Sequence, residues 1–102
     1  MYKLKNEHDQ VAVLVSKGYG AGWSTWGAPE SCLDGEIAQA ILDGRPDQEI
    51  SEIAERNWPG QYQGGLEDCV VEWVAEGQPF EIDEYDGVEG LREIYIGDFL
   101  VA

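Results

Sequence analysis

Hydrophobic residues follow one another without a break over residues 11–15. The run Val-Ala-Val-Leu-Val is rich in β-branched side chains and has the length of a strand. Because both alternating faces of this run are apolar, the pattern predicts a buried strand over residues 11–16 that lies centrally in a sheet.

The next apolar positions recur with the period of a helix. They fall on one helical face at Leu33, Ile37, Ala40 and Ile41. Ser31 or Asp34 is suited to cap the start of this helix, and Gly44 is suited to end it. A second, shorter helix is predicted after the turn at residues 45–47, with Asp47 as its N-cap and with Pro59 ending it.

The last third of the chain has the composition of strands. Residues 68–74 are rich in β-formers, residues 80–85 alternate apolar with polar side chains, and residues 91–96 and 99–102 are again apolar. Turns are indicated at residues 76–79 and at residues 85–90, the second by its Asp86-Gly87 pair. The order β-α-α-β-β-β predicts a single α+β domain over residues 1–102, an antiparallel sheet with two helices on one face.

The charge of the chain bears on its binding partners rather than on its fold. The chain has 21 acidic residues against 6 basic ones, a formal net charge of −15. Residues 1–29 carry three lysines against two acids, so the excess of acid lies entirely in the remainder. Such a surface repels nucleic acids and anionic membranes and attracts a basic protein surface, so no direct binding to either of the first two is expected. The same charge also simply keeps a small protein in solution.

A glycine-rich loop with three aromatic rings follows the first strand. It matches neither the dinucleotide-binding fingerprint, whose third glycine is replaced by Trp23, nor the phosphate-binding P-loop, whose lysine and hydroxyl are replaced by Ala28 and Pro29. Successive backbone N–H groups in a glycine turn still form anion-binding nests, and exposed tryptophans stack on planar groups. The candidate ligand-binding residues are Lys17, Gly18, Tyr19, Gly20, Gly22, Trp23, Ser24, Thr25 and Trp26. The alternative is that Trp23 and Trp26 fill the core.

A second candidate surface is the acidic strand over residues 80–85 and the turn that follows it. Glu81, Asp83 and Tyr85 project from one face at intervals of about 6.6 Å. The candidate partner-binding residues are Glu81, Asp83, Glu84, Tyr85 and Asp86, with Glu67, Asp68, Glu72, Glu89 and Glu93 extending the array. This array is suited to the basic groove of a nucleic-acid-binding protein, and the alternative is a solvated face that discourages edge pairing.

Catalytic and metal chemistry find little support in the sequence. His8 is the only histidine, so neither a Ser-His triad nor a common zinc site is expected, and no metal or cofactor is predicted. Cys32 and Cys69 lack an evident activating base. No signal peptide or membrane-spanning run is recognisable, so a cytoplasmic protein with reduced thiols is expected.

The chain resembles a family of small phage and prophage proteins at residues 13–26 and 80–89. The motifs that carry this resemblance are Gly-Tyr-Gly-Ala-Gly-Trp-Ser-Thr-Trp (18–26) and Glu-Tyr-Asp-Gly (84–87). The resemblance implies a viral accessory protein, of a kind that often binds and disables host factors, and it supplies no reaction. The family motif points to Gly18, Gly20, Gly22, Trp23, Ser24, Thr25 and Trp26, and to Glu84, Tyr85, Asp86 and Gly87.

Three functions are therefore predicted as alternatives, none of them enzymatic. The first is a phage counter-defence inhibitor in the host cytoplasm. Its glycine-tryptophan loop would bind and sequester a small planar or phosphate-bearing, nucleotide-like ligand. The second is an anti-CRISPR-like inhibitor whose acidic strand mimics nucleic acid and covers a basic host protein. The third is a virion or assembly accessory protein. Assembly as a homo-oligomer is left open.

Overall fold

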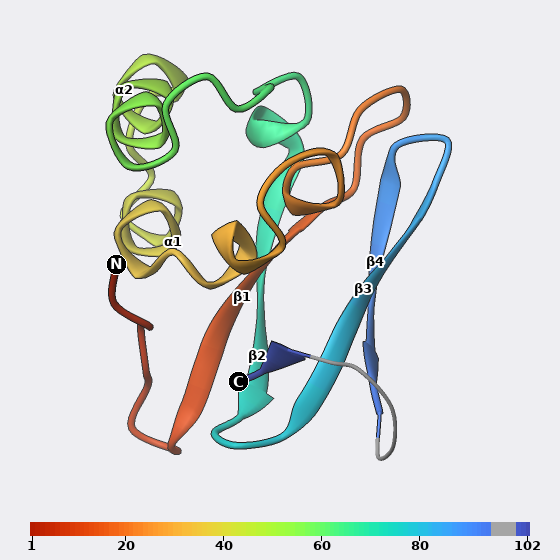
Figure 1. Ribbon diagram of the computed structural model, residues 1–102. Coiled ribbons are helices and arrows are strands. Elements are labelled where there is room, and N and C mark those ends of the chain that lie inside the picture. The colour runs from red at the N-terminus through yellow and green to blue at the C-terminus, as the bar shows by residue number, and fades with distance from the viewer. Residues whose placement is uncertain (95–99) are drawn as a thin grey trace.

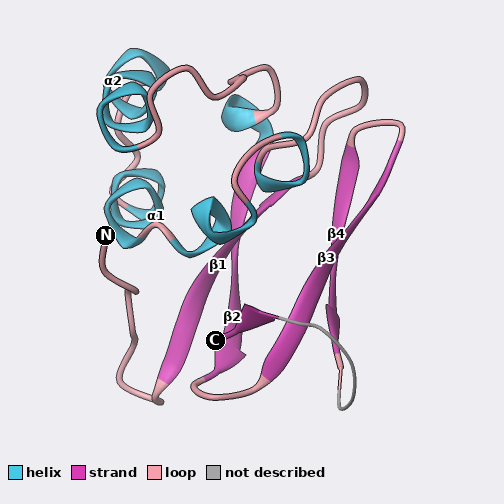
Figure 2. Ribbon diagram, in the orientation of Figure 1, coloured by secondary structure: helices cyan, strands magenta, loops and turns pink. Residues whose placement is uncertain are grey.

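A computed structural model describes residues 1–94 and 100–102, and it divides the domain into three layers (Figures 1 and 2). Two helices form one outer layer, a two-stranded sheet forms the middle layer, and a three-stranded sheet forms the other outer layer. The elements are β1 (Gln10–Ser16), η1 (Ser24–Trp26), η2 (Pro29–Leu33), α1 (Gly35–Leu42), α2 (Asp47–Asn57), η3 (Leu66–Asp68), β2 (Cys69–Ala75), β3 (Pro79–Tyr85), β4 (Val88–Glu93) and β5 (Leu100–Val101). The predicted α+β class and element order are confirmed.

Strand β1 belongs to two hydrophobic cores at once. Its even-numbered residues Ala12 and Leu14 pack in the core beneath α1 and α2. Its odd-numbered valines pack on the opposite side, in a core that includes Phe80 of β3 and Leu91 of β4. Because successive side chains of a strand point to opposite faces, an apolar run is what a strand between two layers requires.

The predicted central position of β1 in a sheet is wrong, although its predicted burial is confirmed. β1 pairs antiparallel with β2, from Gln10 opposite Ala75 to Ser16 opposite Cys69, and the described part of the chain forms this sheet from these two strands. β3 pairs with β4 on one edge and β5 on the other, in a separate sheet. An apolar run indicates that both faces of a strand are buried. In β1, the helices bury one face and the second sheet buries the other.

The predicted helix α1 is confirmed, and so is its cap. Asp34 accepts hydrogen bonds from the backbone N–H groups of Glu36 (2.9 Å) and Ile37 (3.1 Å), and Gly44 beyond the helix has a positive φ of 71°. Leu33 lies in η2 rather than in the helix. The predicted cap of α2 is wrong, because Asp47 is the first helical residue and Pro46 stands at the N-cap without a side-chain bond.

The β3–β4 hairpin turns at the predicted Asp86-Gly87 pair. Both residues have positive φ, 51° and 84°, as the tightest two-residue hairpin turn requires. Strand β4 begins at Val88, three positions before the predicted 91, and of the predicted strand over residues 91–96 the last two lie outside the described residues. Neither α1 nor α2 has the length and hydrophobicity needed to cross a bilayer.

Candidate functional site

The glycine-rich loop is folded around one buried carboxylate, that of Glu89 on β4. Glu89 is 1% exposed. One oxygen accepts from the backbone N–H of Ser16 at 2.9 Å. The other accepts from the N–H of Trp23 at 2.7 Å and from the N–H and hydroxyl of Thr25 at 3.1 and 2.6 Å. Four donors therefore offset the cost of removing this carboxylate from water.

This arrangement corrects the predicted anion nest. The loop does present converging backbone N–H groups, but the carboxylate of Glu89 already accepts their hydrogen bonds. A Cβ atom at Gly22 would lie only 2.8 Å from that carboxylate, so the loop closes tightly over it. A phosphate at this position would have to displace a buried part of the fold. Glu89 is also too buried to extend the predicted acidic array.

The two motifs of the phage-like resemblance lie against each other. Glu84 stands directly opposite Glu89 in the β3–β4 ladder, and its carboxylate accepts from the indole N–H of Trp26 at 3.0 Å. The N–H of Gly20 donates to the carbonyl of Asp86 at 2.7 Å. A side chain at Gly87 would overlap the backbone of Ala21. Both motifs therefore serve first to dock the hairpin onto the loop.

The two tryptophans of the loop have different environments. Trp23 is fully buried, and its indole N–H donates to the carbonyl of Ser31 at 3.3 Å. The predicted stacking role of Trp23 is therefore wrong, and the core alternative applies to it. Trp26 is 44% exposed and stacks on Tyr62, with ring centroids 5.7 Å apart and planes inclined by 26°. Tyr19 is 87% exposed and Ser24 is buried.

Lys17, the only cation of the loop, is held away from a ligand site. Its ammonium lies 3.5 Å from a carboxylate oxygen of Glu72 and 3.5 Å from the carbonyl of Glu89. Its neighbour Gly18 packs so closely on Asp68 that a side chain would overlap that carboxylate. The entrance to the loop is thus lined by acids, and it disfavours a phosphate-bearing ligand.

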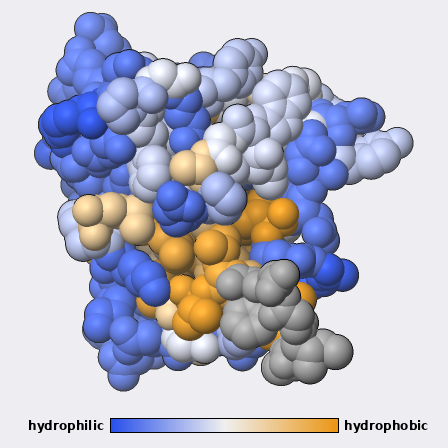
Figure 3. Space-filling model, viewed as in Figure 1, coloured by the Kyte–Doolittle hydropathy of each residue, from blue (hydrophilic) through white to orange (hydrophobic). Residues whose placement is uncertain are grey.

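A groove of about 640 Å³ lies between the loop and strand β3. One side comes from the end of the loop, and the other comes from β3 with its three carboxylates. The lining residues are Ser24, Thr25, Gly27, Pro29, Glu81, Ile82, Asp83, Glu84 and Leu100. Figure 3 shows an apolar patch near the centre of this generally hydrophilic face of the molecule. The groove therefore combines an apolar part with an acidic rim, and it joins residues from both predicted sites.

Arg92 is a member of this acidic face that the sequence analysis missed. It lies opposite Glu81 in the ladder and forms an ion pair with it, and its Nε lies 3.8 Å from a carboxylate oxygen of Asp83. All three side chains remain at least partly exposed. The period-two pattern of the two strands was a sufficient signal for this pairing, given the hairpin turn at residues 86–87.

Two further hollows flank the loop. One, of about 520 Å³, is lined by Trp26, Tyr62, Trp58 and Pro59 together with neighbouring loop residues. The other, of about 350 Å³, lies at the hairpin tip between Tyr19 and Tyr85. Tyr85 and its neighbour Asp86 are exposed there, as predicted for a contact surface.

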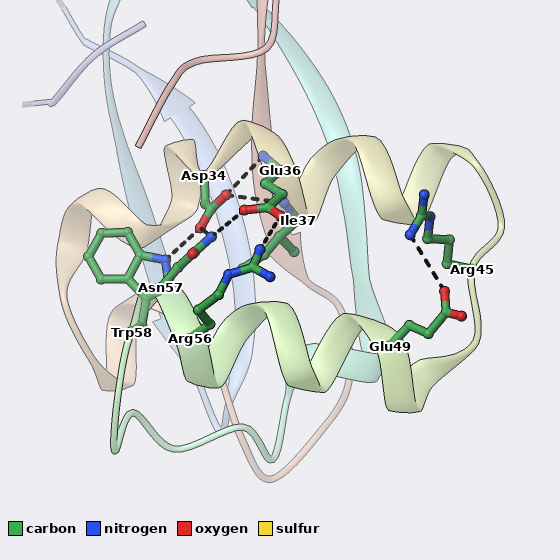
Figure 4. A network of polar contacts seen from close by, with 8 residues as sticks. All are labelled: Asp34, Glu36, Ile37, Arg45, Glu49, Arg56, Asn57 and Trp58. Carbon is green, nitrogen blue, oxygen red and sulfur yellow. Dashed lines mark hydrogen bonds and ion pairs between the residues drawn. The ribbon is translucent and has the colours of Figure 1, made fainter.

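A polar network beside the hollow that Trp26 and Trp58 line holds the two helices together (Figure 4). The second oxygen of Asp34 accepts from the side-chain amide of Asn57 at 3.0 Å and from the indole of Trp58 at 2.8 Å. Glu36 pairs with Arg56 at its side, and this hydrogen bond, together with that from Asn57, lowers the pKa of Glu36. Asp34, the second buried acid, therefore has a structural role.

The two cysteines are free thiols in buried positions. Burial, which is the main cause, raises the pKa of Cys32 to about 12 and that of Cys69 further still. Neither thiol is therefore a nucleophile at neutral pH. Within the described residues, no three His, Cys, Asp or Glu side chains gather as metal ligands would.

Comparisons of the chain with protein-family models, with curated proteins and with solved structures found no match. The resemblance to phage and prophage proteins thus rests on its two motifs alone. The function must be argued from the loop, the groove and their charges.

Proposed function

We propose that this protein is a non-enzymatic inhibitor that covers a basic surface of another protein with the acidic groove on β3. The observation that carries the proposal is the groove itself, in which Glu81, Asp83 and Glu84 border apolar lining residues. Apolar contact supplies affinity, while carboxylates at the rim steer a basic partner and fix its orientation.

Arg92 supports a guanidinium-bearing partner. Its guanidinium lies between Glu81 and Asp83, so the face already binds the chemical group that an arginine of a partner would present. Carboxylates in this arrangement accept the donors of a guanidinium in fixed geometry. Tyr19 and Tyr85, which are both exposed at the hairpin tip, add aromatic faces suited to cation–π contact.

The net charge of −15 extends the attraction beyond the groove. A basic partner that normally binds nucleic acid presents such a surface, and an acidic protein of this kind competes with the nucleic acid for it. A phage-encoded counter-defence role fits this mode of action, and the motif resemblance is its support.

A small planar ligand is a second candidate, in a narrower form than the sequence analysis predicts. The exposed part of Trp26 beside Tyr62 favours it, because an aromatic platform stacks on planar groups. The prediction that this ligand bears a phosphate loses support. The carboxylate of Glu89 already accepts the hydrogen bonds of the loop, and acids surround Lys17. Trp26→Ala separates the two candidates, since it removes the platform and keeps Glu81 and Asp83.

The experiment is an affinity capture from bacterial lysate at low salt with three forms of the protein. The wild type and a control with Glu7→Gln and Glu52→Gln, both exposed and outside the groove, are expected to retain the same basic protein. The groove variant with Glu81→Gln and Asp83→Asn carries the same charge change and is expected to lose it. Equal retention by all three forms would contradict the proposed site.

A further inference from the structure

Strand β2 has one edge with no neighbouring strand in the described structure. Among the strands of residues 1–94 and 100–102, β2 pairs with β1 alone. On β1, the N–H groups of Ala12 and Ser16 donate to Leu4 and to the side chain of Glu89, so they point away from β2. In an antiparallel ladder these positions alternate with the hydrogen-bonded ones.

The same alternation fixes which groups of β2 point outward. Ala12 lies opposite Trp73 and Leu14 opposite Val71, so both residues of β2 direct their N–H and C=O groups to the free edge. No hydrogen bond within residues 1–94 and 100–102 uses these four backbone groups. Long edges of this kind are templates for pairing with another chain.

This edge lacks the devices that protect edge strands. Residues 69–75 contain no proline and no lysine, and their one charge, Glu72, is paired with Lys17, the residue that follows β1. Val70 is 41% exposed, whereas Val71 and Trp73 are half-buried against the helical core. The edge is thus apolar and locally neutral in a protein with a net charge of −15.

We infer that the β2 edge binds the β2 edge of a second copy of this chain, in an antiparallel pairing. The edge of β2 has no unpaired charge, so it does not attract a basic partner, which binds the acidic groove on β3 instead. A second copy of this chain has the same neutral edge and is therefore the partner that fits it. A two-fold pairing centred on Glu72 places Val71 of each copy opposite Trp73 of the other, so all four free groups on each copy find partners. The two Glu72 side chains then lie opposite each other, and Lys17 of each copy offsets the charge of its own Glu72. The result is a four-stranded sheet in the order β1-β2-β2-β1.

Salt distinguishes this association from the proposed function. Two copies repel through their net charge, and salt screens that repulsion, so the dimer is expected to strengthen as salt rises. Binding of a basic partner to the groove is expected to weaken under the same conditions. Failure of one inference therefore leaves the other standing.

The test joins sedimentation velocity with residue-resolved amide hydrogen exchange on the intact chain. We expect a monomer–dimer equilibrium that shifts to dimer with concentration and salt, in which the amides of Val71 and Trp73 become protected as the dimer forms. The amides of Val70 and Glu72, which face β1, are the internal reference for exchange in the monomer. A monomer at every concentration, or a dimer in which Val71 and Trp73 exchange freely, would overturn the inference.

A matched pair of variants tests the same edge by mutation. Val71→Pro and Val71→Ala both replace the branched side chain of valine, and only proline also removes the outward N–H, which edge strands tolerate. Two amides are lost per dimer, so Val71→Pro is expected to dimerise about tenfold to hundredfold more weakly than Val71→Ala. Circular dichroism verifies that both remain folded, and equal dimerisation of the two folded variants would exclude this edge.

Discussion

At the scale of single residues, Glu89 organises the loop that the sequence places at the centre of the chain. Its carboxylate is buried without a guanidinium or ammonium group on it, and hydrogen-bond donors from Ser16, Trp23 and Thr25 stabilise it instead. Only a carboxylate offers enough acceptor sites for this set of donors. The glycines of the loop let its backbone approach that carboxylate closely.

Replacement of this residue measures its contribution directly. Glu89→Gln keeps the shape but turns an NH2 group toward donors, so at least one buried N–H loses its acceptor. We expect the free energy of unfolding to fall by about 2–3 kcal/mol in urea titrations. Glu93→Gln on the same strand, at an exposed position, is the control, and it is expected to change stability by less than about 0.5 kcal/mol. Equal stability of Glu89→Gln and wild type would refute this role.

At the scale of elements, Asp34 joins both helices to the core. Asp34→Ala removes the cap of α1 and leaves the indole N–H of Trp58 without its acceptor. We expect a loss of about 2–3 kcal/mol in unfolding free energy, the sum of a lost cap and a lost buried hydrogen bond. Asp47→Ala, in the first turn of α2, makes no side-chain cap and should lose only a few tenths of a kcal/mol. Similar losses in the two variants would show that the buried network adds nothing.

The pair of Glu36 and Arg56 gives a pH-dependent contribution. Hydrogen bonds from Arg56 and Asn57 lower the pKa of Glu36 in the folded protein. The added stability is therefore full above the unfolded pKa and is lost as the pH falls through the folded pKa. Glu36→Gln should differ most from wild type near neutral pH and converge with it in acid, in chemical denaturation at a series of pH values. Because the pair is solvent-exposed, the difference is expected to be small, and a gap that widens in acid would reverse the assignment.

The elements were largely predictable because their signals are local. The helical period, the Asp34 cap, Gly44 and the Asp86-Gly87 turn each act within a few residues. The separation into two sheets was not, because an apolar run such as residues 11–15 reports that both faces are covered and not what covers them. The cap of α2 was misplaced by one residue, since Pro46 and Asp47 both suit a helix start.

The site was harder to predict than the elements because its contacts are long-range. Nothing near Glu89 in sequence indicates that it accepts hydrogen bonds from residues 16–25, and the acids Asp86 and Glu93 lie within four residues of it without such a role. Burial of Trp23 and exposure of Trp26 likewise depend on η1, which turns the two rings in different directions. The period-two pattern of the strand did predict Glu81 and Asp83 on one face. Together with the hairpin turn, the same pattern was sufficient to place Arg92 opposite Glu81.

At the scale of the whole molecule, two kinds of surface coexist on a strongly acidic protein. The groove on β3 has three carboxylates against the one guanidinium of Arg92, so it attracts cations, whereas the β2 edge is apolar and locally neutral. The three-layer fold places them on different sheets. A dimer formed through β2 would accordingly carry two grooves, and a partner with two basic sites would gain from binding both at once.

Arg92 competes with a partner for the groove, so its removal should strengthen binding. Arg92→Gln frees Glu81 and Asp83 from their internal cation. We expect the affinity for an arginine-rich peptide to rise several-fold at low salt, by the modest energy of an exposed ion pair, in a calorimetric titration. The control is Arg45→Gln, which changes the net charge by the same amount. Arg45 pairs with Glu49 at the helices, away from the groove. An equal rise in both variants would trace the effect to net charge alone.

The most direct test of the acidic groove is a calorimetric titration of an oligo-arginine peptide into matched charge variants. The groove variant has Glu81→Gln with Asp83→Asn, and the control has Glu7→Gln with Glu52→Gln, so their net charges are identical. If the groove binds guanidinium groups, the groove variant loses most of the wild-type affinity, while the control keeps nearly all of it and remains salt-sensitive. If both variants weaken by the same factor, binding reflects the overall charge, and the groove is not the site.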